Sequence, residues 1–582
     1  MGHSTWGKIG KILFLIYPKE RAIRAHFGYL RRPWTICFLA LTVILLQIVG
    51  CDSSTPEPKP SSSPDVPIYG GVFKRAFSSG VLTLDPCEVS DSFSHEVCRQ
   101  IFDGLVEFDP EGKVVPALAD KWTISQDGLI YTMMLRPNCR FQAISGPNDL
   151  PTQNGGRLVT AEDVEYTFRR VLTPKILARR AKLFWVIKGA RQFNEGAKPS
   201  IEGIKVISSD TVSFTLEKPF APFLSLLALS NTFILPKEDV EHLKKDFAWS
   251  PVGTGPFIWG GKSGETIILK ANQNYFRGRP YLDRIEFPII PDESESFAAF
   301  KRGELMDVAV PDPEYKNVKQ DPVWAPYFQE SSRWGTYYLG FNVATFPFDN
   351  IKVRQAINYA IDREAIVKLI LNDRARVANG VLPPGILAYN NALKGYSYNL
   401  EKAKTLLAEA GYPDGKGFPE ITLQINRDSI HSRTSEFILA NLRDLGINCN
   451  IKEVEFQEHL ATLESGKAPF FRSGWTVDYP DPDDFLYTLF HSENIGSGMN
   501  FGCYSNAKVD DLLTRARNEI DTKKRIELYQ RAEEYIVDDA PWVFIYHYTT
   551  HLLCQSYVRG LAITPMGTTF ILYRKAWFAK TP

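Results

Sequence analysis

The amino-acid sequence predicts a mixed α/β fold from residue 69 onward. Short runs that alternate polar and apolar residues indicate strands, as in Thr211 to Leu216 and Thr266 to Lys270. Apolar residues at helical spacing indicate helices over Lys352 to Leu371, Leu400 to Ala410 and Asp510 to Val537. The sequence has no internal repeat of fixed period, which argues against a solenoid or a propeller.

The helix starts carry recognisable signals. Thr160-Ala161-Glu162-Asp163 has a capping threonine followed by acids in the first turn, which predicts a helix beginning there. A chain of 582 residues is long enough for several domains or lobes.

The net charge of zero is the sum of two unequal parts. Residues 1–34 hold seven basic residues and one acid, Glu20, so their charge is +6. Residues 35–50 carry no charge, and the body from Cys51 therefore holds 60 bases and 66 acids, a charge of −6. An acidic body argues against nucleic acid as a partner.

Residues 1–50 have the layout of an export signal. The basic stretch precedes sixteen uncharged, mostly apolar residues, fewer than the roughly 20 of a spanning helix. Ile48-Val49-Gly50-Cys51 resembles the lipobox of bacterial lipoproteins, in which the signal peptide is removed and the cysteine thiol is acylated. The alternative is an uncleaved anchor ending in an ordinary cysteine. Either reading places the body outside the cytoplasm, and a translation start near Leu30 would give a leader of ordinary length.

Residues 51–68 are rich in Ser and Pro. Such a segment cannot bury enough apolar surface to fold, and its prolines keep it extended. We expect it to be a tether between the lipid anchor at Cys51 and the folded body.

The sequence motifs of common catalytic and nucleotide-binding sites are absent or incomplete. Gly253 to Phe257, followed by Gly260 to Ser263, has a phosphate-loop composition, but Pro256 stands where that motif requires glycine and offers no N–H. The sequence has no G-x-S-x-G, H-E-x-x-H or C-x-x-C motif. His547 and His551 lie on an expected strand, without metal-ligand spacing. We predict no enzyme, no metal site and no cofactor.

Six cysteines remain after Cys37 of the leader and Cys51 are set aside: Cys87, Cys98, Cys139, Cys449, Cys503 and Cys554. An even number in an oxidising compartment permits disulfides, and Cys87 is close enough in sequence to Cys98 for the two to pair. Six buried thiols are equally compatible with the sequence.

The segment from Arg472 to Asp484 has the most unusual local chemistry. It contains four acids in seven residues, two prolines and flanking aromatic residues, so a metal site, a glycosidase carboxylate pair and a cation pocket are all conceivable. The prolines disfavour a calcium loop, and a linear motif cannot show a carboxylate pair. We expect Asp481, Asp483 and Asp484 to cap a helix that begins near Phe485. Asp478 lies outside that role and, beside aromatic rings, suits an ammonium group.

Many short motifs after residue 69 resemble one family, the extracytoplasmic solute-binding proteins of the oligopeptide- and dipeptide-binding family (family 5) that serve ABC importers. The matching stretches are, in order, Leu84–Pro86, Ile101–Leu105, Pro116–Trp122, Ser125–Gly128, Thr160–Val164, Pro251–Phe257, Leu339–Asn342, Val353–Arg363, Ala408–Tyr412 and Gly474–Pro482. Each motif is modest alone, but their number and order make the resemblance specific.

The resemblance implies a two-lobed periplasmic-binding-protein fold, type II-like, with a hinge. Lobe 1 would comprise residues 69–310 and 546–582, with an accessory subdomain at about 103–200, and lobe 2 would comprise residues 311–545. The chain would cross between the lobes near Met306 to Pro311 and return near Val543 to His547.

The resemblance also implies the site residues. Asp478 matches the acid that binds the α-ammonium group of a peptide, and Trp475 flanks it. Gly474 and Thr476 match strand positions that offer backbone groups to an extended peptide. Ser90, Asp91 and Ser92 match the facing segment of the other lobe, although an acid is sometimes found first there. Arg472 matches a basic position near the far end of the ligand.

The predicted function is therefore peptide transport. The protein would be a monomeric, lipid-anchored lipoprotein of the periplasm or cell surface that captures short peptides and delivers them to a transmembrane permease. Some members of the family take nickel chelates, haem, murein peptides or sugars instead, and Asp478 alone does not exclude these. An extracytoplasmic hydrolase that uses the acidic segment is the alternative from another class.

Overall fold

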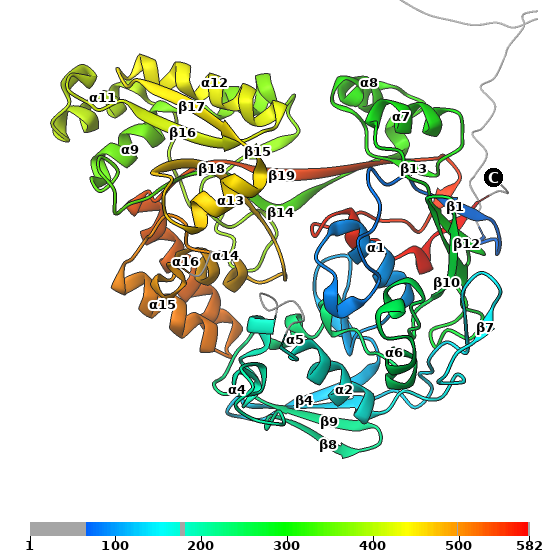
Figure 1. Ribbon diagram of the computed structural model, residues 1–582. Coiled ribbons are helices and arrows are strands. Elements are labelled where there is room, and N and C mark those ends of the chain that lie inside the picture. The colour runs from blue at the N-terminus through cyan, green and yellow to red at the C-terminus, as the bar shows by residue number, and fades with distance from the viewer. Residues whose placement is uncertain (1–65, 175–180, 497–498, 580–582) are drawn as a thin grey trace, which may run out of the picture. The chain divides into compact units, whose positions relative to one another are not determined.

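The computed structural model describes residues 66–174, 181–496 and 499–579 (Figure 1). The predicted leader, the lipid site at Cys51 and the tether up to residue 65 lie outside the described residues. None of the helices in the described ranges is both long enough and apolar enough to cross a membrane.

One lobe is built around a four-stranded sheet of order β1-β12-β11-β10. Its strands are β1 (Val72–Lys74), β12 (Arg284–Phe287), β11 (Thr266–Ala271) and β10 (Phe257–Ser263), and β11 confirms one of the predicted strands. Helix α1 (Ser92–Ile101) packs beside it together with the C-terminal segment, where β20 (Val558–Arg559) pairs with β21 (Trp577–Phe578). Tyr573 of that segment donates a hydrogen bond of 2.7 Å to buried Glu96 of α1, so the two ends of the body meet in this lobe.

A second sheet, of order β4-β5-β9-β8, forms a separate layer at the edge of this lobe (Figure 1). Its strands are β4 (Ala119–Ile124), β5 (Ile130–Leu135), β9 (Thr211–Thr215) and β8 (Ile204–Ser208), and β9 confirms the other predicted strand. Two short pairs lie outside these sheets: β2 (Val106–Phe108) with β3 (Val114–Pro116), and β6 (Ile144–Ser145) with β7 (Leu150–Pro151), which lies beside β10 of the first sheet.

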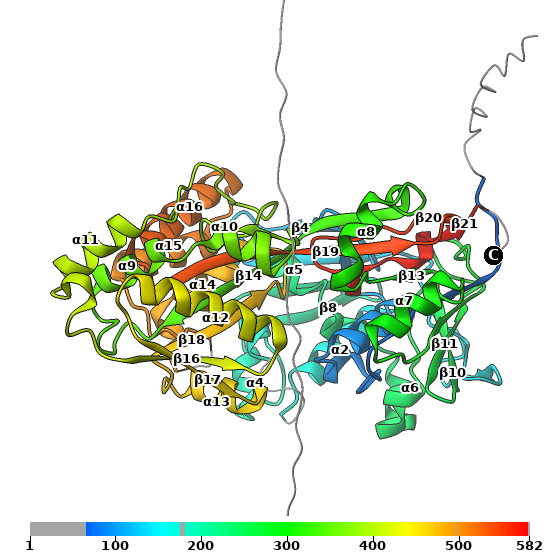
Figure 2. The same ribbon diagram turned by 90° about the horizontal axis from the view of Figure 1, so that it is seen from above.

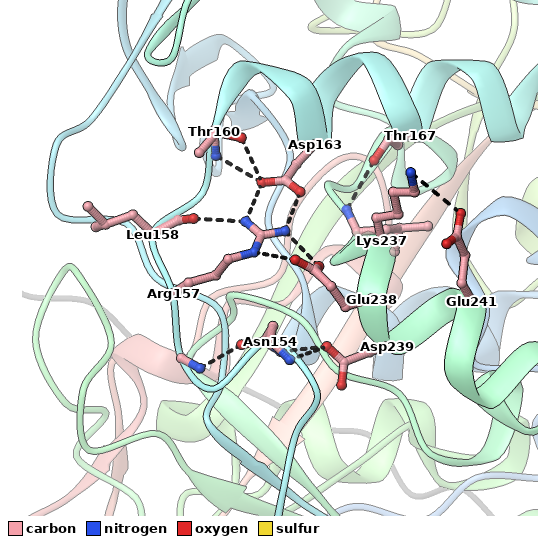
Figure 3. Close-up of polar contacts among 12 residues, drawn as sticks. Asn154, Arg157, Leu158, Thr160, Asp163, Thr167, Lys237, Glu238, Asp239 and Glu241 are labelled. Atoms are coloured by element: carbon pink, nitrogen blue, oxygen red, sulfur yellow. Dashed lines mark hydrogen bonds and ion pairs between the residues drawn. The ribbon is translucent and has the colours of Figure 1, made fainter.

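Helix α2 (Ala161–Val171) covers this sheet and begins where the sequence predicts. The Asp163 carboxylate accepts a hydrogen bond of 2.9 Å from the Thr160 N–H, which satisfies a donor at the start of the helix. Arg157 bridges Asp163 and Glu238 of α6 (Lys237–Leu243), at 2.7 Å from each carboxylate, and so ties the two helices together (Figure 3).

The other lobe holds a mixed sheet flanked by helices. Its strands β18 (Phe470–Thr476), β16 (Ile421–Asn426) and β17 (Cys449–Val454) are neighbours in that order. Its main helices are α9 (Ile351–Ala360), α11 (Leu400–Glu409), α12 (Ser429–Asp444), α13 (Phe456–Glu464), α14 (Pro482–Phe490), α15 (Ala507–Asn518) and α16 (Thr522–Asp539). The predicted helix at 400–410 is confirmed by α11.

Two predicted helices are wrong in extent because each is interrupted. The segment 352–371 breaks after α9, where Ile361 is extended, and resumes as α10 (Arg363–Ala365) and a π-helical turn at Ile366–Ile370. Asp362 starts the second piece by accepting a hydrogen bond from the Ala365 N–H. The segment 510–537 divides between α15 and α16, and Asp521 caps the second helix. Helical spacing of apolar residues persists across both breaks, so periodicity alone does not show them.

Two long strands run from one lobe to the other (Figures 1 and 2). These are β14 (Phe328–Phe341) and β19 (Trp542–Cys554), which pair antiparallel from Phe328 with Leu553 to Gly340 with Trp542. The short strand β13 (Asp307–Val308) pairs with the C-terminal end of β19, and β15 (Ala375–Val377) pairs with its middle, at Tyr546 to Tyr548. The predicted two-lobed fold is confirmed, and the register between β14 and β19 shifts between Ser332 and Thr336, part-way along the crossing. The boundaries given above for each lobe stay a prediction.

The described cysteines, Cys87, Cys98, Cys139, Cys449, Cys503 and Cys554, are free thiols. Cys87 and Cys98 are both buried in the core of the first lobe, and burial raises the pKa of the Cys87 thiol to about 12. Of the two possibilities that the sequence leaves open, the structure favours thiols over a Cys87–Cys98 disulfide.

His547 lies on β19 where that strand crosses between the lobes, and it is only 2% exposed. The Thr336 hydroxyl donates to the carbonyl of Val381 at 2.8 Å, so it accepts from the Nδ1–H of His547 at 2.9 Å. Burial lowers the pKa of His547 to about 3. The histidine therefore belongs to the packed crossing, in its neutral form.

We expect the crossing to make the protein sensitive to acid. The folded state resists protonation of His547 down to a pKa of about 3, whereas the unfolded chain takes the proton near 6.5, so the free energy of unfolding falls as the pH drops below about 6.5. His547→Gln should lose about 2 kcal/mol less than the wild type between pH 7 and pH 5. Urea unfolding at the two pH values measures this, and parallel losses in both proteins would contradict it.

Candidate ligand-binding site

A cavity of about 210 Å³ lies between segments of the two lobes. Its walls from the first lobe include Ser90, Ser92, His95, Arg99, Ser230 and Phe570. Its walls from the other lobe include Arg333, Trp334, Thr476, Val477 and Asp478. The structure thus brings together Ser90 and Ser92 with Thr476 and Asp478, which lie almost 400 positions apart in the sequence.

The remaining predicted residues lie around this cavity rather than in its walls. Asp91 is the N-cap of α1 and accepts a hydrogen bond of 2.9 Å from the Ser94 N–H. This explains an acid between two serines: it fixes the start of the helix and thereby the positions of Ser90 and Ser92. His95 follows on the same helix, with its Nδ1 close to the Ser230 hydroxyl across the wall.

Asp478 is half-buried, and its carboxylate has no hydrogen-bond or ion-pair partner among the described residues. The backbone N–H of Asp478 donates to the carboxylate of Asp484 at 2.9 Å, and the indole Nε1–H of Trp475 donates to the same oxygen at 3.1 Å. Burial and the nearby negative charge of Asp478 raise the pKa of Asp484 well above its usual range. Trp475 therefore helps to hold the loop that presents Asp478.

The expectation that three acids cap one helix is confirmed for Asp481 only. Helix α14 begins at Pro482, earlier than predicted, and Asp481 accepts a hydrogen bond of 2.9 Å from the Asp483 N–H. Asp483 instead accepts from the hydroxyl of Tyr479 at 2.7 Å and pairs with Arg517 of α15 at 3.2 Å. Sequence position suggests capping for all three, but Asp483 and Asp484 accept hydrogen bonds from other residues instead.

Strand β18 has an open side next to the cavity. It pairs with β14 over its whole length, from Phe470 with Phe341 to Thr476 with Gly335, but β16 pairs with it only at Phe470 and Phe471. In the described part of the chain, no strand continues this second ladder along the rest of β18. An extended peptide could add there as a strand.

Gly474 lies on this strand in a crowded position. A Cβ atom at Gly474 would lie 2.4 Å from the hydroxyl oxygen of Tyr548, so a larger residue would displace that ring. The position therefore favours glycine because of the close approach of the Tyr548 side chain, whatever its role toward a ligand.

Arg472 does not line the cavity. Its guanidinium lies 4.5 Å from the centre of the Tyr337 ring and donates a hydrogen bond of 3.0 Å to the Asn426 side chain. Its Nε is buried without a partner. The structure places this arginine in an aromatic cluster of the second lobe, on the same face of β18 as Gly474.

Two arginines that line the cavity were not predicted from the sequence. Arg99 is on α1, and Arg333 is on β14. Neither belongs to a local motif, and only the packing of α1 against the C-terminal segment and the crossing of β14 bring them beside Asp478. Among the described residues, no group of three or more His, Cys, Asp or Glu side chains is placed to hold a metal ion.

Comparison with known proteins shows the family of this chain. A family model described as bacterial extracellular solute-binding proteins, family 5, matches residues 113–497. The chain belongs to this family. It is 31% identical to the dipeptide-binding protein of Escherichia coli, over 91% of this chain and 94% of that one. It is 30% identical to the heme-binding protein A of Haemophilus influenzae, over 91% and 97% of the two chains.

Solved structures of family 5 proteins share the fold. The periplasmic binding protein DppA of Helicobacter pylori, in complex with the peptide STSA, has a TM-score of 0.72 and 30% identity, and covers 88% of this chain and 99% of that one. HbpA2 of Haemophilus parasuis has a TM-score of 0.74 and 29% identity, with 87% and 100% covered. The predicted membership of the oligopeptide- and dipeptide-binding family is confirmed, and it is a family of binding proteins.

We expect the buried pair of Arg525 and Asp481 to be essential to this part of the site. Arg525 of α16 is 5% exposed and makes two hydrogen bonds to the Asp481 carboxylate, at 2.9 and 2.5 Å. Arg525→Ala leaves a buried carboxylate uncompensated, at a cost of about 3–5 kcal/mol in the free energy of unfolding.

The matched control is Arg515→Ala on α15, since Arg515 is 59% exposed and pairs with Asp511 on the surface. It should cost less than about 1 kcal/mol. Urea unfolding measures the free energy of unfolding of both variants. Equal losses would contradict the importance of the buried Arg525–Asp481 pair.

Proposed function

We propose that this family 5 protein is a lipid-anchored solute-binding protein that captures short peptides between its lobes and delivers them to the permease of an ABC transporter. It performs no chemistry of its own. The observation that carries the proposal is the half-buried Asp478 carboxylate, which has no partner among the described residues and faces a cavity between the two lobes.

The relatives support peptides as the solute class. The names of the similar proteins describe a dipeptide-binding protein and a binding protein in complex with the peptide STSA, and also proteins that bind haem or glutathione. A carboxylate without a partner favours peptides and glutathione over haem, because both carry an ammonium group and haem does not.

Recognition of the peptide through its backbone would allow the protein to bind peptides with different side chains. The unpaired side of β18 near Gly474 and Thr476 offers N–H and C=O groups to an added strand, and those hydrogen bonds are the same for every peptide sequence. Ser90 and Ser92 from the first lobe would close over the other side of the ligand. A ligand that touches both walls binds the closed arrangement more tightly than the open one. That difference in binding free energy drives closure.

We place the division of the body at residues 69–310 with 546–582 for lobe 1 and 311–545 for lobe 2. The accessory subdomain at about 103–200 belongs to lobe 1. The crossing strands β14 and β19 join the two parts and would act as the hinge. We further propose that the protein works as a monomer, since both walls of the cavity come from one chain.

Asp478→Ala should abolish tight peptide binding. In the closed cavity the ammonium of the ligand would lose its counter-charge, at a cost of about 3–5 kcal/mol, which is more than a hundredfold in affinity. Isothermal titration calorimetry with a tripeptide measures this. Asp511→Ala, an exposed acid of α15, is the control and should bind as the wild type does. Unchanged affinity in Asp478→Ala would refute the assignment.

Cys51→Ser should release the protein from the membrane. One acylated cysteine at the mature N-terminus supplies the anchor, and serine does not form the thioether. We expect the wild type in the membrane fraction, labelled by a palmitate analogue, and the variant unlabelled and in the soluble fraction. A labelled Cys51→Ser protein would show that the lipid is attached elsewhere.

A further inference from the structure

The cavity between the lobes contains more positive than negative charge. Arg99 has no hydrogen-bond or ion-pair partner among the described residues, and its Nε is buried without one. Its guanidinium is stacked instead on the ring of Phe570, at 4.1 Å from the ring centre. Burial lowers the pKa of Arg99 to about 10, which leaves it cationic at neutral pH.

The acid that interacts electrostatically with Arg99 already binds two other arginines. Glu107 lowers the electrostatic cost of burying Arg99, but its carboxylate binds Arg277 at 2.6 Å and Arg574 at 2.7 Å. One carboxylate with two arginines bound to it cannot neutralise a third. The guanidinium of Arg99 is thus left for a group outside the fold.

Arg333 is the second unmatched cation. It is an exposed residue of β14 that lines the same cavity, and no acid in the described residues lies within ion-pair distance. Arginines in the packed regions around the cavity are matched: Arg525 pairs with Asp481, and Arg517 pairs with Asp483. Other buried arginines that have no acid, such as Arg354 and Arg363, donate to backbone carbonyls instead. Arg99 and Arg333 have neither an acid nor a carbonyl acceptor among the described residues.

The lining of the cavity combines one free carboxylate, that of Asp478, with these two free guanidinium groups. Asp478 takes one positive charge from a ligand, and the arginines take two negative charges. Guanidinium groups present a planar fork of donors that matches a carboxylate. A volume of about 210 Å³ is below the usual 300–1,000 Å³ of small-molecule pockets, so the ligand is short.

We propose that the preferred ligand is a short acidic peptide of net charge −1, an inference that rests on the proposed function. Its α-ammonium group binds Asp478, and its two carboxylates, one at the C-terminus and one on a side chain, bind Arg99 and Arg333. The arginines thereby select among peptides that the backbone contacts along β18 would accept equally.

Calorimetry with matched tripeptides tests this selection. The series is Ala-Glu-Ala and Ala-Ala-Glu (net −1), their glutamine counterparts (net 0), and Ala-Lys-Ala (net +1), all at neutral pH and low salt. We expect at least one glutamate peptide to bind about tenfold or more tightly than its glutamine counterpart, with the lysine peptide weakest. Equal affinities across the series would overturn the inference and leave peptide binding intact. Absence of binding by every peptide would overturn the proposed function, and the inference with it.

Arg333→Gln tests the source of the selection. Arg333 is exposed, so its replacement leaves the packing of β14 in place, and the ratio of affinities between glutamate and glutamine peptides should fall to below about threefold. Arg302→Gln, a surface arginine of the same protein that pairs with Glu295 and Glu304, is the control and should retain the full ratio. Retention of the ratio in both Arg333→Gln and Arg99→Gln would overturn the assignment of the two arginines.

Discussion

The pairing of β14 with β19 is the contact on which the rest of the body depends. These strands carry the chain between the lobes in opposite directions, and an antiparallel ladder with two register shifts connects them. Because β14 also pairs with β18, the position of the crossing fixes the edge that leads to Thr476 and Asp478. The same strand presents Arg333 and Trp334 to the cavity. Buried, neutral His547 lies in the middle of this arrangement, so the crossing is packed like a core.

The acidic segment after β18 shows how four similar side chains acquire different tasks. Asp481 caps α14 and is neutralised by Arg525, while Asp483 is held by Tyr479 and Arg517. Asp484 accepts hydrogen bonds from the backbone of Asp478 and from Trp475. Each of these three is buried and satisfied by donors of the fold. Of the four, only Asp478 lines the cavity and has a carboxylate without a partner among the described residues, and that difference is why we propose it as the ligand-binding acid.

The balance of charge around the cavity follows the same logic. Buried charges are stable when they are paired or hydrogen-bonded, and arginines of the packed regions have such partners: Arg525 has the carboxylate of Asp481, and Arg354 has backbone carbonyls. Asp478, Arg99 and Arg333 have no hydrogen-bond or ion-pair partner for their charged groups among the described residues, and all three line one cavity. Such incomplete pairing suits a protein that must both bind and release its ligand. In the proposed complex the ligand supplies the opposite charges, and after release water solvates the three side chains.

The sequence by itself determined the class of the fold, the helix start at Thr160, the strands β9 and β11, and the family, since each of these depends on local pattern or on ordered motifs. It also proposed Asp478, which lies within a family motif, and Ser90 and Ser92, which follow the Leu84–Pro86 motif at short range. Tertiary structure decided where the helices at 352–371 and 510–537 break, since an interrupted helix keeps its apolar spacing. It alone assigned Asp483 and Asp484 to buried donors and moved Arg472 out of the cavity. Above all, it brought Arg99 and Arg333 beside Asp478, because charges on three distant elements meet only when the lobes pack, and no sequence spacing records that meeting.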